Sequence, residues 1–214
     1  MRRLPRRRHD GKSRRSDDFR LQEMNPEEAA RANFYGLLAR LFYAPPDAAL
    51  LQAIARADAI DAQEGGIAPA WRELARAAAG ADPEAVREEY ETAFVGTGKA
   101  PVTLYACAYS IRYTSEAPLA ELRADLAALG LARRGGTSEP EDHIAALCET
   151  MRHLIAEQKA ELADQQRFFS RWIQPAAGRL CDAIAESEIT HFYEPVARFA
   201  KSFFELELAA FEML

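Results

Sequence analysis

The chain has 214 residues, 49% of them hydrophobic, and a formal net charge of −6 at neutral pH. This length suits one sizeable domain, or two small lobes that share a core. No apolar run approaches the roughly 20 residues that cross a bilayer, so we expect a soluble protein without stable membrane association.

The charge is divided unevenly along the chain. The first 20 residues carry nine Lys and Arg against three Asp, so +6 lies there and −12 on all the other residues together. An acidic body repels nucleic acid and attracts basic peptides, so no nucleic-acid partner is expected. The pair Arg14-Arg15 is not followed by the apolar stretch of an export signal. We expect residues 1–23 to be a basic disordered tail, or a misassigned start that precedes Met24.

Helix-start signals recur through the first half of the chain. An acidic or amide side chain before a proline or an apolar run is typical of a helix N-terminus. Four helices are predicted from such signals, with starts at Asn25-Pro26, at Asp47, after Pro69 and at Asp82-Pro83. Residues 95–115 then form the one long non-helical stretch, in which only Val102–Tyr105 alternates like a strand.

The second half shows the same helical periodicity. Its predicted helices begin at Pro118, in the stretch TSEPEDH (137–143), near Asp164, at Pro175 and at the Phe- and Tyr-rich run that opens with Phe192. These patterns predict an all-α fold, a single helical domain of about eight or nine helices in two lobes. The expected lobes are residues 24–110 and 111–214, divided at the long loop.

Cysteine and glycine motifs indicate neither a metal site nor a phosphate site. Cys107, Cys148 and Cys181 are far apart and form no CxxC pair, so we expect reduced thiols in a cytoplasmic setting. No His, Cys or carboxylate spacing typical of metal ligands occurs, and we expect no metal and no cofactor. The segment Gly96–Lys99 lacks the spacing and the following hydroxyl of a phosphate-binding loop.

The stretch TSEPEDH has two competing interpretations. Ser138 with Glu141 makes a capping box, with Pro140 in the first helical turn. This interpretation leaves His143 unexplained, because cations are disfavoured at a helix N-terminus. The competing interpretation is a ligand-facing role for His143. The alternative functions are an enzyme or nucleotide-binding protein that uses Asp142 and His143, or a purely structural helical adaptor in which the stretch is only a cap.

Two motifs resemble one protein family. Glu139-Pro140-x-Asp142-His143 is similar to the E-P-x-D-H motif of the TorD/DmsD/NarJ-type chaperones, which bind molybdoenzyme subunits and their twin-arginine signal peptides. The segment Tyr90–Gly98 resembles the aromatic-x-x-Leu-Phe-x-Gly-Pro-Gly run of that family, and Tyr105 resembles the tyrosine of its following loop. Ala93 and Thr97 depart from the usual leucine and proline.

The resemblance implies a dedicated cytoplasmic chaperone of redox-enzyme maturation, with no catalytic residues. Its implied partners are an apo-molybdoenzyme catalytic subunit and that subunit's signal peptide, with weak guanine-nucleotide binding in addition. The long loop allows a monomer or a domain-swapped dimer. Carboxylates for arginine and aromatic rings for an apolar helix are the groups such a site needs. The implied peptide-binding residues are Tyr90, Phe94, Tyr105, Glu139, Pro140, Asp142 and His143.

Overall fold

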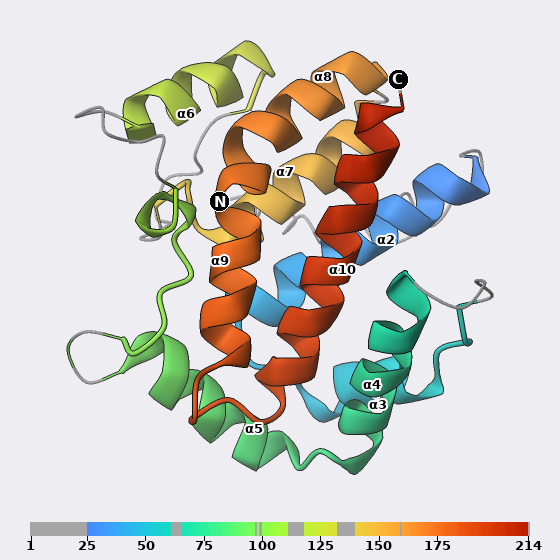
Figure 1. Cartoon of the computed structure of the whole chain (residues 1–214), viewed down its shortest axis with the longest axis vertical. Helices are drawn as coiled ribbons and strands as arrows, with labels where there is room; N and C mark the ends of the chain where they lie inside the picture. Colours follow the sequence, from blue (N-terminus) through green and yellow to red (C-terminus); the bar gives the residue numbers. More distant parts are fainter. Residues whose placement is uncertain are drawn as a thin grey trace, which may run out of the picture.

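The fold was established from a computed structural model of the whole chain (Figure 1). The structure describes the following parts of the chain: residues 25–60, 66–96, 98, 100–110, 118–131, 140–158 and 160–213. The predicted basic tail, residues 1–23, lies outside the described residues. Within them the regular structure is helical, without a named strand, which confirms the all-α prediction.

Side-chain caps begin three helices of the first half, as the sequence predicts. These are Asn25 before α2 (Pro26–Tyr43), Asp47 before α3 (Ala48–Arg56) and Asp82 before α5 (Pro83–Tyr90). In each case a side-chain oxygen accepts a hydrogen bond from a backbone N–H of the first turn, at 3.1, 2.7 and 3.4 Å. The caps satisfy amides that have no partner inside the helix.

Helix α4 (Ile67–Gly80) begins earlier than predicted. We expected its start after Pro69, but Gly66 precedes the helix with a φ of 70°, and Pro69 occupies the third helical position. A proline is tolerated there because the N–H it lacks would have no intrahelical acceptor. After α5, a π-helical turn η1 (Glu91–Val95) ends at Gly96, which adopts a φ of 63°.

The second half contains the remaining helices and two short turns. These are η2 (Ala106–Ala108), α6 (Pro118–Ala128), α7 (Ile144–Ala156), α8 (Leu162–Phe168), η3 (Phe169–Ile173), α9 (Gln174–Ala185) and α10 (Tyr193–Glu212). In Figure 1, α8, η3 and α9 form one bent rod. The π-helical turn η3 lies just before Pro175, which cannot donate a backbone hydrogen bond to the preceding turn.

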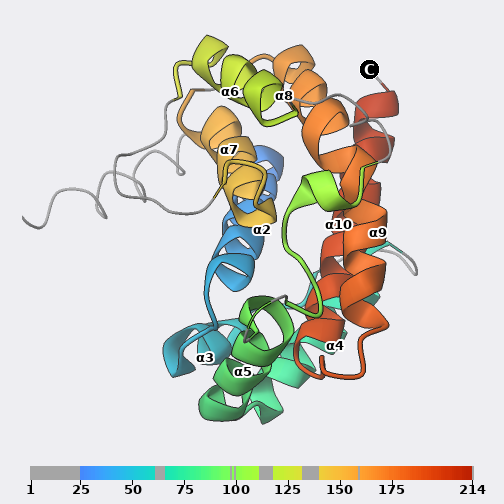
Figure 2. The ribbon, with the colours of Figure 1, turned by 90° about the vertical axis from the view of Figure 1, so that its left-hand side faces the viewer.

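Helices from the two halves of the chain pack against one another. Helix α2 runs alongside α7, and α10 lies between its antiparallel neighbour α9 and α4 (Figures 1 and 2). The buried side chains form one continuous core that runs from Ala32 to Phe211. The boundary between the predicted lobes at residues 110 and 111 stays a prediction, and the core is shared across it.

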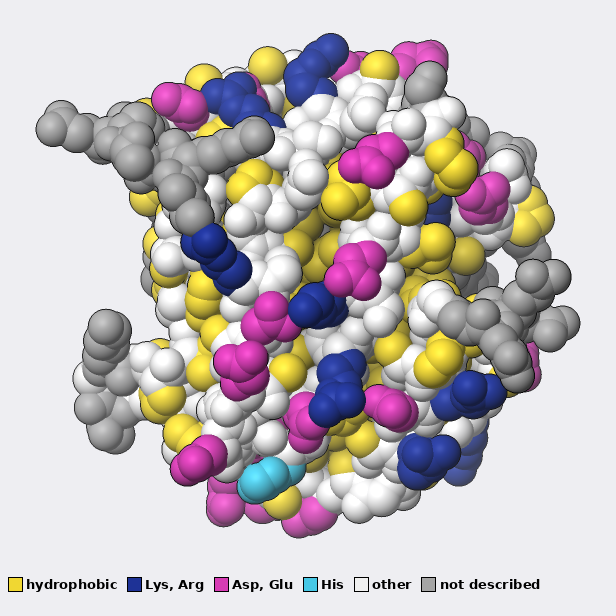
Figure 3. Space-filling model, in the orientation of Figure 1, with side chains coloured by type: hydrophobic (Ala, Val, Ile, Leu, Met, Phe, Trp, Pro, Cys, Tyr) yellow, Lys and Arg dark blue, Asp and Glu magenta, His cyan; other side chains and the backbone are white. Residues whose placement is uncertain are grey.

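Charged side chains of both signs are scattered over the face shown in Figure 3, with hydrophobic side chains between them. In the described part of the chain, no helix is both long and apolar enough to cross a membrane. The described cysteines are all free thiols, with Cys148 and Cys181 buried in the core as expected.

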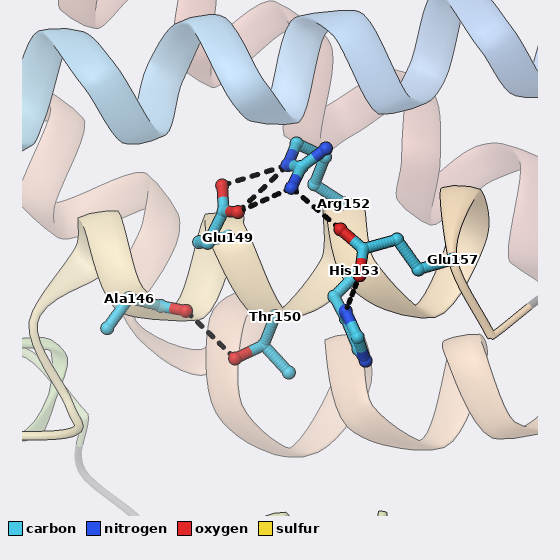
Figure 4. Close-up of polar contacts among 6 residues, drawn as sticks. All are labelled: Ala146, Glu149, Thr150, Arg152, His153 and Glu157. Carbon is cyan, nitrogen blue, oxygen red and sulfur yellow. Dashed lines mark hydrogen bonds and ion pairs between the residues drawn. The ribbon is translucent and has the colours of Figure 1, made fainter. Parts of the chain in front are cut away.

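A glycine allows α2 and α7 to approach closely. A Cβ added at Gly36 would lie 3.0 Å from Cδ of Arg152, which extends from α7 across α2. Figure 4 shows the Arg152 guanidinium pointing toward α2, where it pairs with Glu149 at 2.8 Å and with Glu157 at 3.0 Å. The glycine therefore makes room for the Arg152 side chain beside α2.

A buried ion pair joins the first described helix to the last one. Arg31 of α2 donates two hydrogen bonds to the carboxylate of Glu207 on α10, at 2.7 and 2.9 Å. The hydroxyl of Tyr35 donates a third to Glu207, at 2.9 Å, and only 2% of Glu207 is exposed. Burial and then the Glu207 charge raise the pKa of Tyr35, which keeps it a donor.

A second carboxylate organises the start of α10. The side chain of Glu89 on α5 accepts hydrogen bonds from three successive backbone amides, those of His191, Phe192 and Tyr193, at 2.9, 2.9 and 2.8 Å. A carboxylate at this position satisfies orphan N–H groups and favours the positive end of the helix dipole. Glu89 thus ties α5 to the beginning of the longest helix.

The Arg31–Glu207 pair yields a stability prediction. Substitution Arg31→Met leaves a buried carboxylate without its cation, so the free energy of unfolding should fall by about 3–5 kcal/mol, measured by urea denaturation. The matched control is Arg87→Met, which removes exposed pairs with Glu84 and Glu91 and should cost less than about 1 kcal/mol. Equal losses in the two variants would contradict the importance of the buried pair.

Candidate functional site

Three of the residues implied by the family resemblance meet at the start of α7. Tyr105 and His143 face each other in an isolated antiparallel bridge. The N–H of Ala106 donates to the carbonyl of Asp142 at 2.9 Å, and the N–H of Ile144 donates to the carbonyl of Leu104 at 2.8 Å. The loop that follows α5 is therefore held against the start of α7 by backbone pairing.

His143 caps α7 with its own ring. Its Nδ1 accepts a hydrogen bond from the N–H of Ala145 at 3.2 Å, so this nitrogen carries no proton in that contact. The ring is 7% exposed and meets the ring of Tyr105 edge to face, with 5.4 Å between centroids. The objection that a cation is disfavoured here does not apply, because the ring acts as an acceptor.

The predicted start of this helix is therefore wrong. We expected Pro140 in the first helical turn, but α7 begins at Ile144, and the residues before it form a turn in which the N–H of His143 donates to the Pro140 carbonyl at 3.2 Å. The pairing with residues 104–106 requires an extended backbone at His143, whose φ and ψ are −61° and 131°. Ser138 and Glu139, the expected cap and an implied binding residue, lie outside the described residues.

Asp142 faces inward at this junction. Its side chain is 5% exposed, and one carboxylate oxygen accepts a hydrogen bond from the N–H of Cys107 at 3.3 Å. Burial, and then a hydrogen bond to the Asp142 carboxylate, raise the pKa of the Cys107 thiol to about 12. A buried carboxylate needs such donors, and here they come from the loop that it holds.

Glu141 connects the same turn to α6. Its two carboxylate oxygens accept hydrogen bonds from Nε and Nη2 of Arg123, both at 3.0 Å. Polar contacts also join α6 to η3, where Arg171 pairs with Glu121 and Asp125 at 2.8 Å each. The turn before α7 is thus a junction of three segments: the 102–109 loop, α6 and α7.

Tyr90 and Phe94 lie at a second place, on α5 and η1. The hydroxyl of Tyr90 donates to the carbonyls of Phe42 and Tyr43, at 3.1 and 2.9 Å. The Phe94 ring contacts the rings of Tyr90 and Tyr193, with centroid distances of 5.3 and 4.9 Å. The 102–109 loop connects this place to the start of α7. At its beginning, the N–H of Val102 donates a hydrogen bond to the carbonyl of Ala93 at 3.0 Å.

Both places use their aromatic and charged groups for internal contacts. Tyr105 and Pro140 are the implied residues that stay partly exposed in the described part of the site. No cluster of three or more His, Cys, Asp or Glu residues suited to a metal occurs among the described residues. The arrangement can position a loop and present its outer side to a partner.

Cys107, Glu89 and Leu104 are site residues that the sequence did not reveal. Leu104 acts through its backbone carbonyl, and Cys107 through its backbone N–H as well as its thiol; backbone groups leave no signal in the sequence. Glu89 lies in the acidic run of α5, where nothing distinguishes it from its exposed neighbours.

The environment of Cys107 gives a direct test of this geometry. Replacing Asp142 by Ala removes the negative charge beside the thiol and loosens the loop, so the thiolate becomes more accessible. The rate of reaction of Cys107 with a disulfide reagent at pH 8 should rise about tenfold or more. Cys148 and Cys181 are buried and serve as internal controls, and an unchanged Cys107 rate would contradict the contact.

The chain was compared with known protein sequences and structures. No curated protein sequence matches the chain. The crystal structure of a proposed redox enzyme maturation protein from Archaeoglobus fulgidus is similar, with a TM-score of 0.51 and 21% sequence identity. The similarity covers 82% of this chain and 93% of that one, and at this identity it supports the fold alone.

A family model described as nitrate reductase delta subunit matches residues 61–182. The match spans more than half of the chain and includes both motifs, from the aromatic segment at Tyr90 to the pair Asp142-His143. The protein therefore belongs to the nitrate reductase delta subunit family, in the NarJ- and TorD-type group of redox-enzyme maturation chaperones.

Proposed function

We propose that this protein is a cytoplasmic chaperone that binds an immature molybdoenzyme catalytic subunit together with its twin-arginine signal peptide. It assists cofactor insertion and delays export until the subunit is complete, with no catalytic chemistry of its own. The observation that carries the proposal is the family match over residues 61–182, which includes both motifs.

The charge of the protein suits this client. A twin-arginine signal presents a basic pair followed by an apolar helix, and the chain outside its first 20 residues has a net charge of −12. An acidic surface speeds the capture of a basic peptide at moderate ionic strength. The same surface disfavours nucleic acid.

The motif residues have different roles in this proposal. Asp142 and His143 are buried and hydrogen-bonded, so they act by holding the 102–109 loop at the start of α7. Tyr105 and Pro140 are partly exposed and are positioned to touch a bound segment. Tyr90 and Phe94 support the other end of the same loop from within the core.

The rival function is nucleotide binding or catalysis through Asp142 and His143. Both side chains accept hydrogen bonds from backbone amides, so neither is poised for proton transfer to a ligand. A titration with GTP and ATP distinguishes the two functions. The rival function requires that the wild-type protein binds a nucleotide and that Asp142→Ala abolishes this binding. Weak guanine-nucleotide binding unaffected by that substitution is compatible with the chaperone.

A peptide titration tests the proposed function. A fluorescent peptide with two arginines followed by about ten Leu and Ala residues should bind the wild-type protein, and Asp142→Ala and His143→Ala should each weaken binding about fivefold or more. The loss is expected because both substitutions release the loop that carries Tyr105.

His153→Ala is the matched control for His143→Ala. His153 lies on the surface of α7, where its Nδ1 pairs with Glu157 at 2.9 Å (Figure 4). This control should leave the affinity unchanged. Unchanged affinity in the two motif variants would remove Asp142 and His143 from any role in peptide binding.

A further inference from the structure

An open groove lies away from the motif junction, at the end of the molecule formed by α4, α5 and the segment before α10. Its volume is about 600 Å³. Its lining comes from the last turn of α4, the outer side of α5 and residues 189–192. A smaller hollow of about 360 Å³ adjoins it between α4 and the first turn of α10, with Arg76 and Ala77 common to both.

Small apolar side chains keep the floor of this groove open. The apolar lining residues are Ala77, Ala81, Ala85, Val86, Ile189 and Phe192. Three of these are alanines: Ala77 near the end of α4, Ala81 in the link that follows it and Ala85 in the first turn of α5. A hollow of this size with an apolar floor has room for apolar side chains of a partner.

The charged groups on the rim are mainly acidic. The lining includes three carboxylates, those of Asp82, Glu88 and Glu89, and one arginine, Arg76. Glu89 is occupied by the three amides at the start of α10, whereas Glu88 is exposed and has no ion-pair partner within the described residues. Figure 3 shows acidic side chains gathered at the lower edge of the molecule, over α5. The wall formed by α5 therefore offers carboxylate to a cation.

We propose that this groove is the surface that directly contacts the arginine-bearing apolar peptide of the client. This inference rests on the proposed function and gives that function a binding site distinct from the motif junction. An arginine of the peptide pairs with Glu88 and Asp82 on the α5 wall, and the apolar side chains next to it fill the alanine-lined floor.

The groove and the motif junction are connected through α5. Helix α5 forms one wall of the groove and ends with Tyr90; η1, which carries Phe94, follows it and leads to the loop that Asp142 holds. Glu89 fixes the opposite wall by ordering residues 191–193. Substitutions at Asp142 and His143 thus act on the peptide indirectly, through the loop that carries Tyr105 and through α5, whereas substitutions in the groove act on it directly.

Two groove variants with matched controls test the inference with the same peptide. Glu88→Arg reverses the charge on the rim, and Ala85→Trp fills the floor; both positions are exposed, so the fold should be retained. Each should weaken binding about tenfold or more. The controls are Glu212→Arg, at the far end of α10, and Ala79→Trp, on α4 outside the groove, and both should bind as the wild type does.

A second peptide separates charge from apolar contact. In this second peptide, glutamines replace the two arginines. Glu88→Arg and the wild-type protein should then bind with nearly the same affinity, while Ala85→Trp should still bind more weakly than the wild type. Urea denaturation of each variant confirms that the loss is not caused by unfolding.

The outcomes separate this inference from the proposed function. If both groove variants bind as tightly as the wild type while Asp142→Ala loses affinity, the groove is not the contact surface but the chaperone function stands. If the wild-type protein binds neither peptide, the proposed function fails and the inference fails with it.

Discussion

The backbone pairing between residues 104–106 and 142–144 is the constraint on which the functional part of the molecule depends. Two hydrogen bonds, from Ala106 to Asp142 and from Ile144 to Leu104, attach a long loop to the start of a core helix. Asp142 and His143 complete the attachment with their side chains, one accepting from Cys107 and the other capping α7. The motif therefore holds the loop in place through contacts within the protein. Under the proposed function, buried residues such as Asp142 and His143 affect peptide binding by positioning this loop.

Two further carboxylates, the buried Glu207 and the partly buried Glu89, connect segments that are distant in the sequence. Glu207 joins α10 to α2 through Arg31 and Tyr35, and Glu89 joins α5 to the first turn of α10. Each carboxylate is compensated by several donors, as burial of a charge requires. Together they hold the two ends of α10 and so fix the wall of the α4–α5 groove. At these two positions, acidic side chains therefore serve the fold.

Local signals in the sequence predict most of the helices but not their contacts. Asn25, Asp47 and Asp82 cap helices as expected, because a cap is recognised within a few residues. The sequence predicts the start of α7 too early, because Ser138 and Pro140 match the pattern of a helix N-terminus. The distant loop at 104–106 instead imposes an extended backbone on His143.

The same limit applies to the candidate site. The motif Asp142-His143 is visible in the sequence through its similarity to a family, but its partners Leu104, Ala106 and Cys107 contribute backbone groups that carry no sequence pattern. The Arg31–Glu207 pair spans 176 positions, and no periodicity relates residues that far apart. Sequence reasoning therefore identifies the motif, and the three-dimensional packing determines what the motif does.

The most direct test of this account is a residue-resolved NMR titration of the labelled protein with the twin-arginine peptide. The account predicts that the largest amide shifts occur at the α4–α5 groove, around Ala81, Ala85 and Glu88, while the Ala106 and Ile144 amides keep their slow hydrogen exchange. Loss of protection at Ala106 and Ile144, with no shift in the groove, would show that the peptide displaces the loop and binds the motif itself. That result would contradict the assignment of Asp142 and His143 as a structural joint.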